Sequence, residues 1–234
     1  MCAGAGFDWV LIDGEHAPFD LARMIHHMQA INQFDVSSIV RIPSSDPHFV
    51  KQLVDAGAQS ILVPMVESVE QAQLMAKSMR YPPKGIRGVG TALARAAQWN
   101  RVDNYYAKAD DQICLIVQIE SVKGVEVLDD ILKVEGVDVV FIGPADLAAS
   151  MGFLGESGRE EVVESVIGCI EKINKAGKYA GFLTTNHSLI EKYESSGAKM
   201  IGVGLDTILL SKATQGLAEK YKPELTEKKS NTVY

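Results

Sequence analysis

Two acidic side chains directly follow strand-like apolar segments, and their placement indicates a cation site. Glu120 ends the segment CLIVQIE, and Asp146 follows VDVVFIG within the motif GPAD. A carboxylate at the end of a strand buried on both faces has to be exposed there or held by a cation. Barrels of alternating strands and helices carry their catalytic groups at this end of the strands. The sequence therefore predicts that Glu120 and Asp146 lie side by side and share one metal ion.

The chemistry of these two side chains favours particular metals. Two carboxylates suit Mg²⁺ or Mn²⁺, with Co²⁺ as a further candidate, because hard cations prefer oxygen ligands and keep some of their waters. Zn²⁺ would call for Cys and His ligands. The alternative is that Glu120 caps the helix after it and Asp146 is the N-cap of the helix beginning LAASMG. For either residue alone this alternative is favoured, and the pair favours the metal.

A third group of polar residues follows the first strand-like segment. The motif DGEHAPFD holds His16 among Asp13, Glu15 and Asp20. A histidine beside carboxylates can act as a general acid or base near neutral pH, because an acid orients the ring and stabilises its protonated form. The alternative is a surface histidine hydrogen-bonded to Asp13 or Glu15.

Arg41 lies in the segment SSIVRIP, where the apolar pattern predicts a buried strand. A guanidinium in that position needs an anion or a developing oxyanion as its partner. The alternative is an ion pair with an acid at the same end of the sheet, which is compatible with facing a substrate. In the motif GPAD, the backbone N–H groups of Ala145 and Asp146 could bind a carboxylate, since the turn opens a helix.

The elements that position these residues alternate between strands and helices. Seven strand-like segments are separated by stretches with helical apolar spacing, such as 46–57, 68–79 and 158–177. These strands are FDWVLID, SSIVRIP, SILVPMV, CLIVQIE, VDVVFIG, YAGFLT and KMIGVG. The alternation predicts an α/β fold, either a TIM (β/α)8 barrel or a doubly wound open sheet. The barrel is favoured because no GxGxxG follows the first strand and polar groups follow several strands.

The predicted barrel is one strand short of eight. We expect its first strand and helix to be missing from this chain. The short motif RGVG at 87–90 is interpreted as an active-site loop, within a segment at 80–106 that breaks the alternation. Residues 1–222 are expected to form a single barrel domain, with an amphipathic helix near its end and a polar tail at 223–234.

Composition excludes several functional classes. The formal net charge is −7 and the basic residues are scattered, so nucleic acid is not expected as a partner. No apolar run approaches the roughly 20 residues needed to cross a membrane. The three cysteines are far apart, which favours a reducing compartment and a cytoplasmic protein.

Six motifs occurring in order give the chain a strong resemblance to a known family. They are GFDWVLIDGEHAP, VRIP, LVPMVES, RYPPKGIRGVGTALAR, VQIES and FIGPADLA. Together they resemble the HpcH/HpaI family of class II pyruvate aldolases, which have a TIM barrel of the phosphoenolpyruvate/pyruvate type. The resemblance implies a divalent-metal-dependent lyase that cleaves 4-hydroxy-2-oxo acids, such as 4-hydroxy-2-oxoheptane-1,7-dioate, reversibly to pyruvate and an aldehyde through a metal-stabilised enolate.

The resemblance also implies a role for individual positions. Glu120 and Asp146 would bind the metal, and Gln118 with the backbone of Ala145 and Asp146 would hold pyruvate. Arg41 would stabilise negative charge on the substrate oxygen, and His16 would be the acid–base group. Two acids are implied as its neighbours: Asp55, which raises its basicity, and Asp13.

Several outcomes remain open at this level. Oxaloacetate decarboxylation, or cleavage of 2-dehydro-3-deoxy sugar acids, would use the same chemistry. A catalytically silent assembly subunit with an incomplete barrel is an alternative from another class. The resemblance further implies a homohexamer in which C-terminal helices are exchanged between neighbours.

Overall fold

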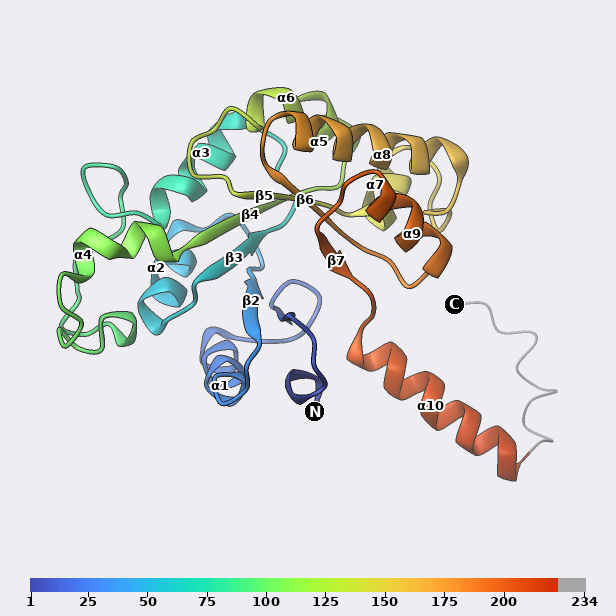
Figure 1. Ribbon diagram of the computed structural model, residues 1–234, viewed down its shortest axis with the longest axis horizontal. Helices are drawn as coiled ribbons and strands as arrows, with labels where there is room; N and C mark the ends of the chain where they lie inside the picture. The colour runs from blue at the N-terminus through green and yellow to red at the C-terminus, as the bar shows by residue number, and fades with distance from the viewer. Residues whose placement is uncertain (223–234) are drawn as a thin grey trace.

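The computed structural model describes residues 1–222, so the predicted polar tail at 223–234 lies outside the described residues. Its centre is one sheet of seven parallel strands in sequential order (Figure 1). The strands are β1 (Trp9–Asp13), β2 (Ser37–Arg41), β3 (Ser60–Val63), β4 (Cys114–Ile119), β5 (Val139–Ile142), β6 (Tyr179–Leu183) and β7 (Met200–Gly202). All seven predicted strands are confirmed.

Helices follow the strands as the apolar spacing predicts. They are α1 (Leu21–Ile31), α2 (Pro47–Ala56), α3 (Val69–Ser78), α4 (Tyr105–Lys108), α5 (Val122–Glu126), α6 (Leu128–Ile131), α7 (Pro144–Ser150), α8 (Glu160–Lys175), α9 (His187–Ser195) and α10 (Asp206–Tyr221). Asp46 caps the start of α2 through a hydrogen bond from the backbone N–H of His48, and Gly57 ends it with a φ of 107°. This left-handed cap is cheap for glycine, which has no Cβ.

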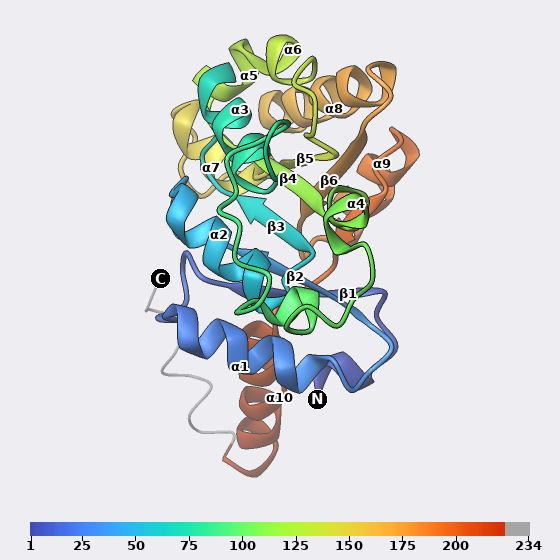
Figure 2. The same ribbon diagram turned by 90° about the vertical axis from the view of Figure 1, so that its left-hand side faces the viewer.

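The strand order decides between the two predicted architectures. A doubly wound sheet reverses its strand order at a switch point, whereas β1 to β7 pair strictly in sequence. Figures 1 and 2 show the sheet curled, with α1 to α3 and α5 to α9 in an arc around its outer side. In the described residues β1 pairs with β2 and β7 pairs with β6, so the curl does not close. The fold is therefore an α/β barrel wall that is one strand short, as predicted.

The two faces of the sheet bury different clusters. The outer face packs on the helices in a large core, whereas the inner face carries a smaller cluster of Ile39, Leu62, Ile116, Val139 and Phe141. Successive side chains in a strand point to opposite faces. The residues two positions beyond Ile39 and Ile116, namely Arg41 and Gln118, therefore face the inside at the carboxyl ends of their strands. Two strands that are otherwise apolar therefore each place one polar side chain on the inner face of the sheet.

Two segments lie apart from the sheet. Helix α10 projects away from the end of β7 and buries none of its residues within the chain (Figure 1). The segment 80–112 forms an irregular excursion that contains α4 and the 3-10 turns η2 (Arg95–Ala97) and η3 (Ala109–Gln112). Within residues 1–222, no helix combines the length and the apolar character that crossing a bilayer requires.

Candidate active site

The carboxyl ends of β1 and β2 bring an ionic cluster together. Asp13 and Arg41 are register partners in the two strands. The Arg41 guanidinium donates from Nε to Asp13 Oδ1 at 2.9 Å and from Nη2 to Asp13 Oδ2 at 2.6 Å. Its Nη1 lies 2.9 Å from Glu15 Oε2. The alternative for Arg41, an ion pair with an acid at the carboxyl ends of the strands (the mouth of the sheet), is confirmed, and it involves two acids, Asp13 and Glu15.

This cluster sets the ionisation of its members. Burial opposes charge on Asp13, but the hydrogen bonds and charge of Arg41, together with the backbone N–H groups of Glu15 and His16, outweigh it and lower the pKa of this carboxyl. Burial raises the pKa of Glu15, although Arg41 offsets part of the effect. Burial lowers the pKa of Arg41, but the hydrogen bonds to Asp13 and the charges of Asp13, Glu15 and Glu120 together exceed this effect and raise it. Arg41 therefore stays cationic at the site.

Glu120 follows β4 and is almost completely buried, with 3% of its surface exposed. Its Oε1 accepts a hydrogen bond of 2.8 Å from the backbone N–H of Met65, and its Oε2 accepts one from the side-chain amide of Gln118. The pairing of β4 with β5 ends at Ile119 and Ile142, so the next residues along the two strands are Glu120 and Gly143. A Cβ at Gly143 would collide with the Glu120 carboxylate, so glycine leaves the space in which this carboxylate lies.

The electrostatics of Glu120 fit a cation site. Burial raises the pKa of Glu120 to about 7, and the nearby charges of Asp146 and Glu15 add to the effect. The Oε1 atom of Gln118 is buried in the same place without a hydrogen-bond partner among the described residues. A divalent cation would compensate crowded carboxylates and accept oxygen ligands of this kind. The residues present therefore fit Mg²⁺ or Mn²⁺, although residues 1–222 hold no cluster of three or more His, Cys, Asp or Glu for a metal.

The capping alternatives for the two acids are wrong. Helix α5 is capped by Ser121, whose side chain accepts from the backbone N–H of Gly124, so Glu120 does not cap it. Helix α7 begins at Pro144 with Gly143 as its N-cap. Asp146 is exposed in the first turn of α7, together with Ala145. The first N–H groups of a helix have no partner within it, so those of Ala145 and Asp146 remain available for a substrate carboxylate.

His16 lies in the loop after β1 with its side chain largely exposed. Its backbone N–H donates to Asp13 Oδ1 at 3.3 Å, and its Nε2 is 3.8 Å from Glu15 Oε2, with 68% of the side chain exposed. This geometry matches the surface-histidine alternative within one chain. It also leaves the ring free to meet a substrate at the mouth.

The structure corrects the expected position of Asp55. Asp55 is the penultimate residue of α2, whose ten residues lead away from the mouth and end just before β3 begins. The helix rises about 1.5 Å per residue, so Asp55 lies on the order of 15 Å from the mouth, beside the amino ends of the strands. It binds Arg87 there, with Arg87 Nη2 2.7 Å from Asp55 Oδ1. Within one chain Asp55 therefore does not contact His16.

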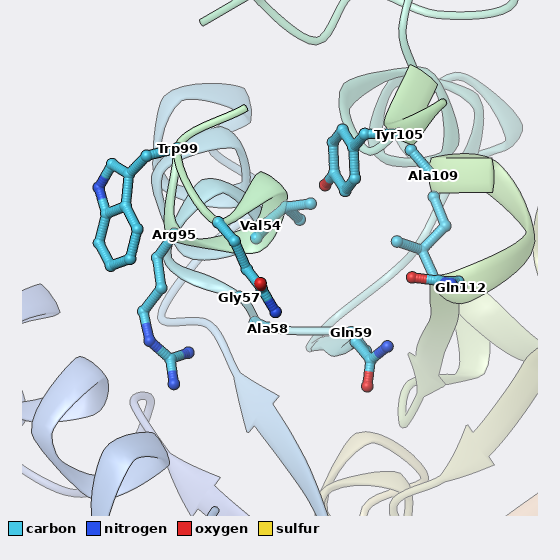
Figure 3. Close-up of a pocket in the computed structure, with 12 residues that line it drawn as sticks. Val54, Gly57, Ala58, Gln59, Arg95, Trp99, Tyr105, Ala109 and Gln112 are labelled. Atoms are coloured by element: carbon cyan, nitrogen blue, oxygen red, sulfur yellow. The ribbon is translucent and has the colours of Figure 1, made fainter. Parts of the chain in front are cut away.

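The interpretation of 87–90 as an active-site loop stays a prediction, because within one chain Arg87 lies beside Asp55 and not at the mouth. Arg87 is fully buried against Asp55, and its guanidinium lies 4.4 Å from the centre of the Tyr81 ring. A cavity of about 400 Å³ opens nearby, between the end of α2 and the segment 95–113 (Figure 3). Arg95, Trp99 and Tyr105 are among the residues around it. Because it lies at the amino ends of the strands, this cavity is separate from Glu120 and the mouth.

Sequence reasoning missed the residues that hold Glu120 in place. Met65 contributes through its backbone, which no side-chain pattern reveals. Gln71 binds the same loop, and the spacing Ser68-x-x-Gln71 was a readable signal, because it is the pattern of a helix capping box.

Comparison with known proteins identifies the family of the chain. Residues 1–213 match the model of the family described as HpcH/HpaI aldolase/citrate lyase. The chain is 50% identical to the hydroxypyruvate/pyruvate aldolase of Deinococcus radiodurans over 97% of its length and 82% of the relative's. It is 46% identical to the 4-hydroxy-2-oxo-heptane-1,7-dioate aldolase of Escherichia coli, over 97% and 86%.

A solved structure supports the same assignment. An HpcH/HpaI aldolase/citrate lyase family protein of Burkholderia cenocepacia superimposes with a TM-score of 0.89 at 33% identity, over 94% of this chain and 88% of that one. The family resemblance that the six motifs predicted is confirmed. By sequence and by fold, the chain belongs to the HpcH/HpaI aldolase/citrate lyase family and is a carbon–carbon lyase.

Proposed function

We propose that the protein is a divalent-metal-dependent class II aldolase that cleaves 4-hydroxy-2-oxo acids reversibly to pyruvate, or a closely similar 2-oxo acid, and an aldehyde. The observation that carries the proposal is the buried Glu120 carboxylate, whose pKa is raised to about 7 beside Asp146 and the unpartnered amide oxygen of Gln118. Two relatives that are named for aldolase activity on 2-oxo acids support the reaction class.

The residues at the mouth divide the work of such a reaction. Glu120 and Asp146 would hold Mg²⁺ or Mn²⁺, with Gln118 beside them. When bound, the cation supplies Lewis acidity to the carbonyl of the 2-oxo acid. The backbone N–H groups of Ala145 and Asp146 would bind the substrate carboxylate and orient it. Arg41, which Asp13 holds, would stabilise the negative charge that develops on the carbonyl oxygen.

His16 is the proposed acid–base group. In the cleavage direction its imidazole would take the proton of the C4 hydroxyl as the bond between C3 and C4 breaks, and it would return that proton in the reverse reaction. Its exposed ring is accessible to a substrate. Its contact with Glu15, at 3.8 Å, restrains the ring only weakly. A further partner would be needed to orient it.

Asp55 can supply that partner from a second copy of the chain. The structure places Asp55 at the opposite end of the sheet from His16, with 28% of the Asp55 side chain exposed. A contact between the two therefore requires two chains. We propose that the active form is a homo-oligomer in which Asp55 of one copy reaches His16 of another, and that α10 packs on a neighbour through its exposed Leu209, Leu210 and Leu217.

Subunit complementation tests this arrangement. His16→Ala and Asp55→Asn variants are expected to be weakly active alone, and co-refolded mixtures should regain activity, because some sites then combine the intact residue from each chain. Variants that stay equally inactive when mixed would contradict the shared site. A mixture of His16→Ala with Glu120→Gln is the control, since both residues come from one mouth and mixing leaves no site intact.

Metal-dependent exchange tests the reaction itself. We expect purified protein with Mn²⁺ and pyruvate in D₂O to exchange the methyl protons of pyruvate, and Glu120→Gln to abolish the exchange. Cleavage of a panel of 4-hydroxy-2-oxo acids then identifies the aldehyde. Folded protein that binds Mn²⁺ yet shows neither exchange nor cleavage would favour the silent assembly subunit.

A further inference from the structure

The loop between β3 and α3 binds the metal-site carboxylate through backbone groups alone. Met65 donates its N–H to Glu120 Oε1 at 2.8 Å, and Val66 donates its N–H to the carbonyl oxygen of Gln118 at 3.0 Å. Both bonds connect the loop after β3 to the carboxyl end of β4. The conformation of this loop therefore decides where the buried end of Glu120 lies.

Met65 adopts a backbone conformation that is unfavourable for its side chain. Its φ is 49°, in the left-handed region that residues with a Cβ rarely occupy. Its side chain does not secure it, since Met65 is 44% exposed. Such a conformation persists only where surrounding contacts over-determine it. Its N–H donates to Glu120, and its carbonyl oxygen needs a second partner to fix the conformation.

Gln71, in the first turn of α3, holds that carbonyl. The side-chain Nε2 of Gln71 donates to Met65 O at 3.1 Å and to Ser45 Oγ at 2.6 Å. Its Oε1 accepts from the backbone N–H of Glu67 at 2.9 Å. The contacts with two backbone groups fix the orientation of the amide, because a carbonyl only accepts and an N–H only donates. One amide thus spans the loops that follow β2 and β3.

The capping box explains why Gln71 is available for this role. The Ser68 hydroxyl accepts from the backbone N–H of Gln71 at 3.1 Å, which places Gln71 at the third position of α3. In an ordinary capping box, the side chain at this position returns to the backbone N–H of the cap residue. Here it reaches one residue further back, to Glu67, and its amino group is left to bind Met65.

We propose that Gln71 is a positioning residue of the metal site: it fixes the left-handed backbone of Met65, so that the Met65 N–H holds Glu120 in its ligating orientation. The inference rests on the proposed function, in which Glu120 binds Mg²⁺ or Mn²⁺. Gln71 itself contacts neither the ion nor the substrate. Partners that orient a metal ligand typically change metal affinity by 10- to 100-fold when they are removed.

A calorimetric titration with Mn²⁺ alone tests this role. We expect Gln71→Ala to weaken Mn²⁺ binding by about 10-fold or more. Gln73→Ala is the matched control, because it is the same substitution on the same helix at an exposed position, and it should leave affinity unchanged. Equal affinity of Gln71→Ala and the unchanged protein would overturn the proposal.

A second background shows whether Gln71 acts through Met65. Glycine takes the left-handed conformation without penalty, so a Met65→Gly chain needs less help to keep it. We therefore expect Gln71→Ala to cost less Mn²⁺ affinity in the Met65→Gly background than in the unchanged one. An identical loss in both backgrounds would show that Gln71 does not act through the backbone of Met65.

Hydrogen exchange separates this proposal from the metal function. In metal-free protein, Gln71→Ala should speed exchange of the Met65 amide by about 10-fold relative to amides within β3, and Gln73→Ala should not. If the unchanged protein fails to bind Mn²⁺, the proposed function fails, and the exchange rate still shows whether Gln71 holds the loop. Unchanged protection of the Met65 amide in Gln71→Ala would refute the positioning role.

Discussion

Replacing Glu120 with Gln is expected to stabilise the metal-free protein at alkaline pH while removing the metal site. Burial of the carboxyl raises the pKa of Glu120 from its ordinary 4.5 to about 7. A folded acid with a raised pKa binds its proton more tightly than the unfolded chain does. Its contribution to stability is therefore present below about pH 4.5 and is lost as the pH rises to about 7.

The magnitude follows from the size of the shift. One pKa unit corresponds to 1.36 kcal/mol, so a shift from 4.5 to about 7 makes the ionised carboxylate cost about 3 kcal/mol above pH 7. A glutamine at 120 avoids this cost and still accepts from the Met65 N–H. The Gln118 amide can turn over to present its unpartnered oxygen to the new amide. For a chain of this length, about 3 kcal/mol corresponds to an increase in Tm of roughly 6–12 °C.

Urea unfolding followed by circular dichroism, with EDTA and at fixed protein concentration, measures the effect. We expect Glu120→Gln to be more stable than the unchanged protein at pH 8, and the difference to fade at pH 4.5. With Mn²⁺ in place of EDTA, at 1,000 times its Kd, the order at pH 8 should reverse, because a ligand at that concentration adds about 4.1 kcal/mol to the protein that binds it, which exceeds the cost of about 3 kcal/mol. A variant that is less stable at pH 8, or equally changed at both pH values, would refute the electrostatic reasoning.

Three further substitutions test other parts of the site. Arg41→Ala should lower turnover by about 100-fold, far more than it lowers the free energy of unfolding, and equal relative losses in kinetics and urea unfolding would make Arg41 structural. His16→Ala should lower the rate of cleavage by about 10²–10⁴-fold. Stability and pyruvate affinity should change little, since 68% of the His16 side chain is exposed. A large change in pyruvate affinity, measured by calorimetry, would contradict its role. Gly143→Ala should abolish Mn²⁺ binding in calorimetry and lower the free energy of unfolding by about 1–3 kcal/mol, because the new Cβ would meet the Glu120 carboxylate. Gly168→Ala on α8 is the control, since a Cβ there meets nothing within 4 Å. In thermal melts this control should be neutral or stabilising.

The sequence alone determined the alternation of strands and helices and the strand ends at which polar groups occur. This succeeded because apolar periodicity reflects which faces of a strand or helix are buried. The motifs around Asp13, Glu120 and Asp146 identified the family, because each motif is a short local pattern that can be recognised without the fold.

Only the tertiary structure reveals contacts between residues that are far apart in the sequence. Asp55 and Arg87 are 32 residues apart, and only the folded chain shows that they bind each other at the far end of the sheet from His16. Met65 and Glu120 are 55 residues apart and meet through a backbone N–H, which carries no side-chain signature. Such contacts depend on strand register and loop conformation, and these are fixed only when the sheet has assembled.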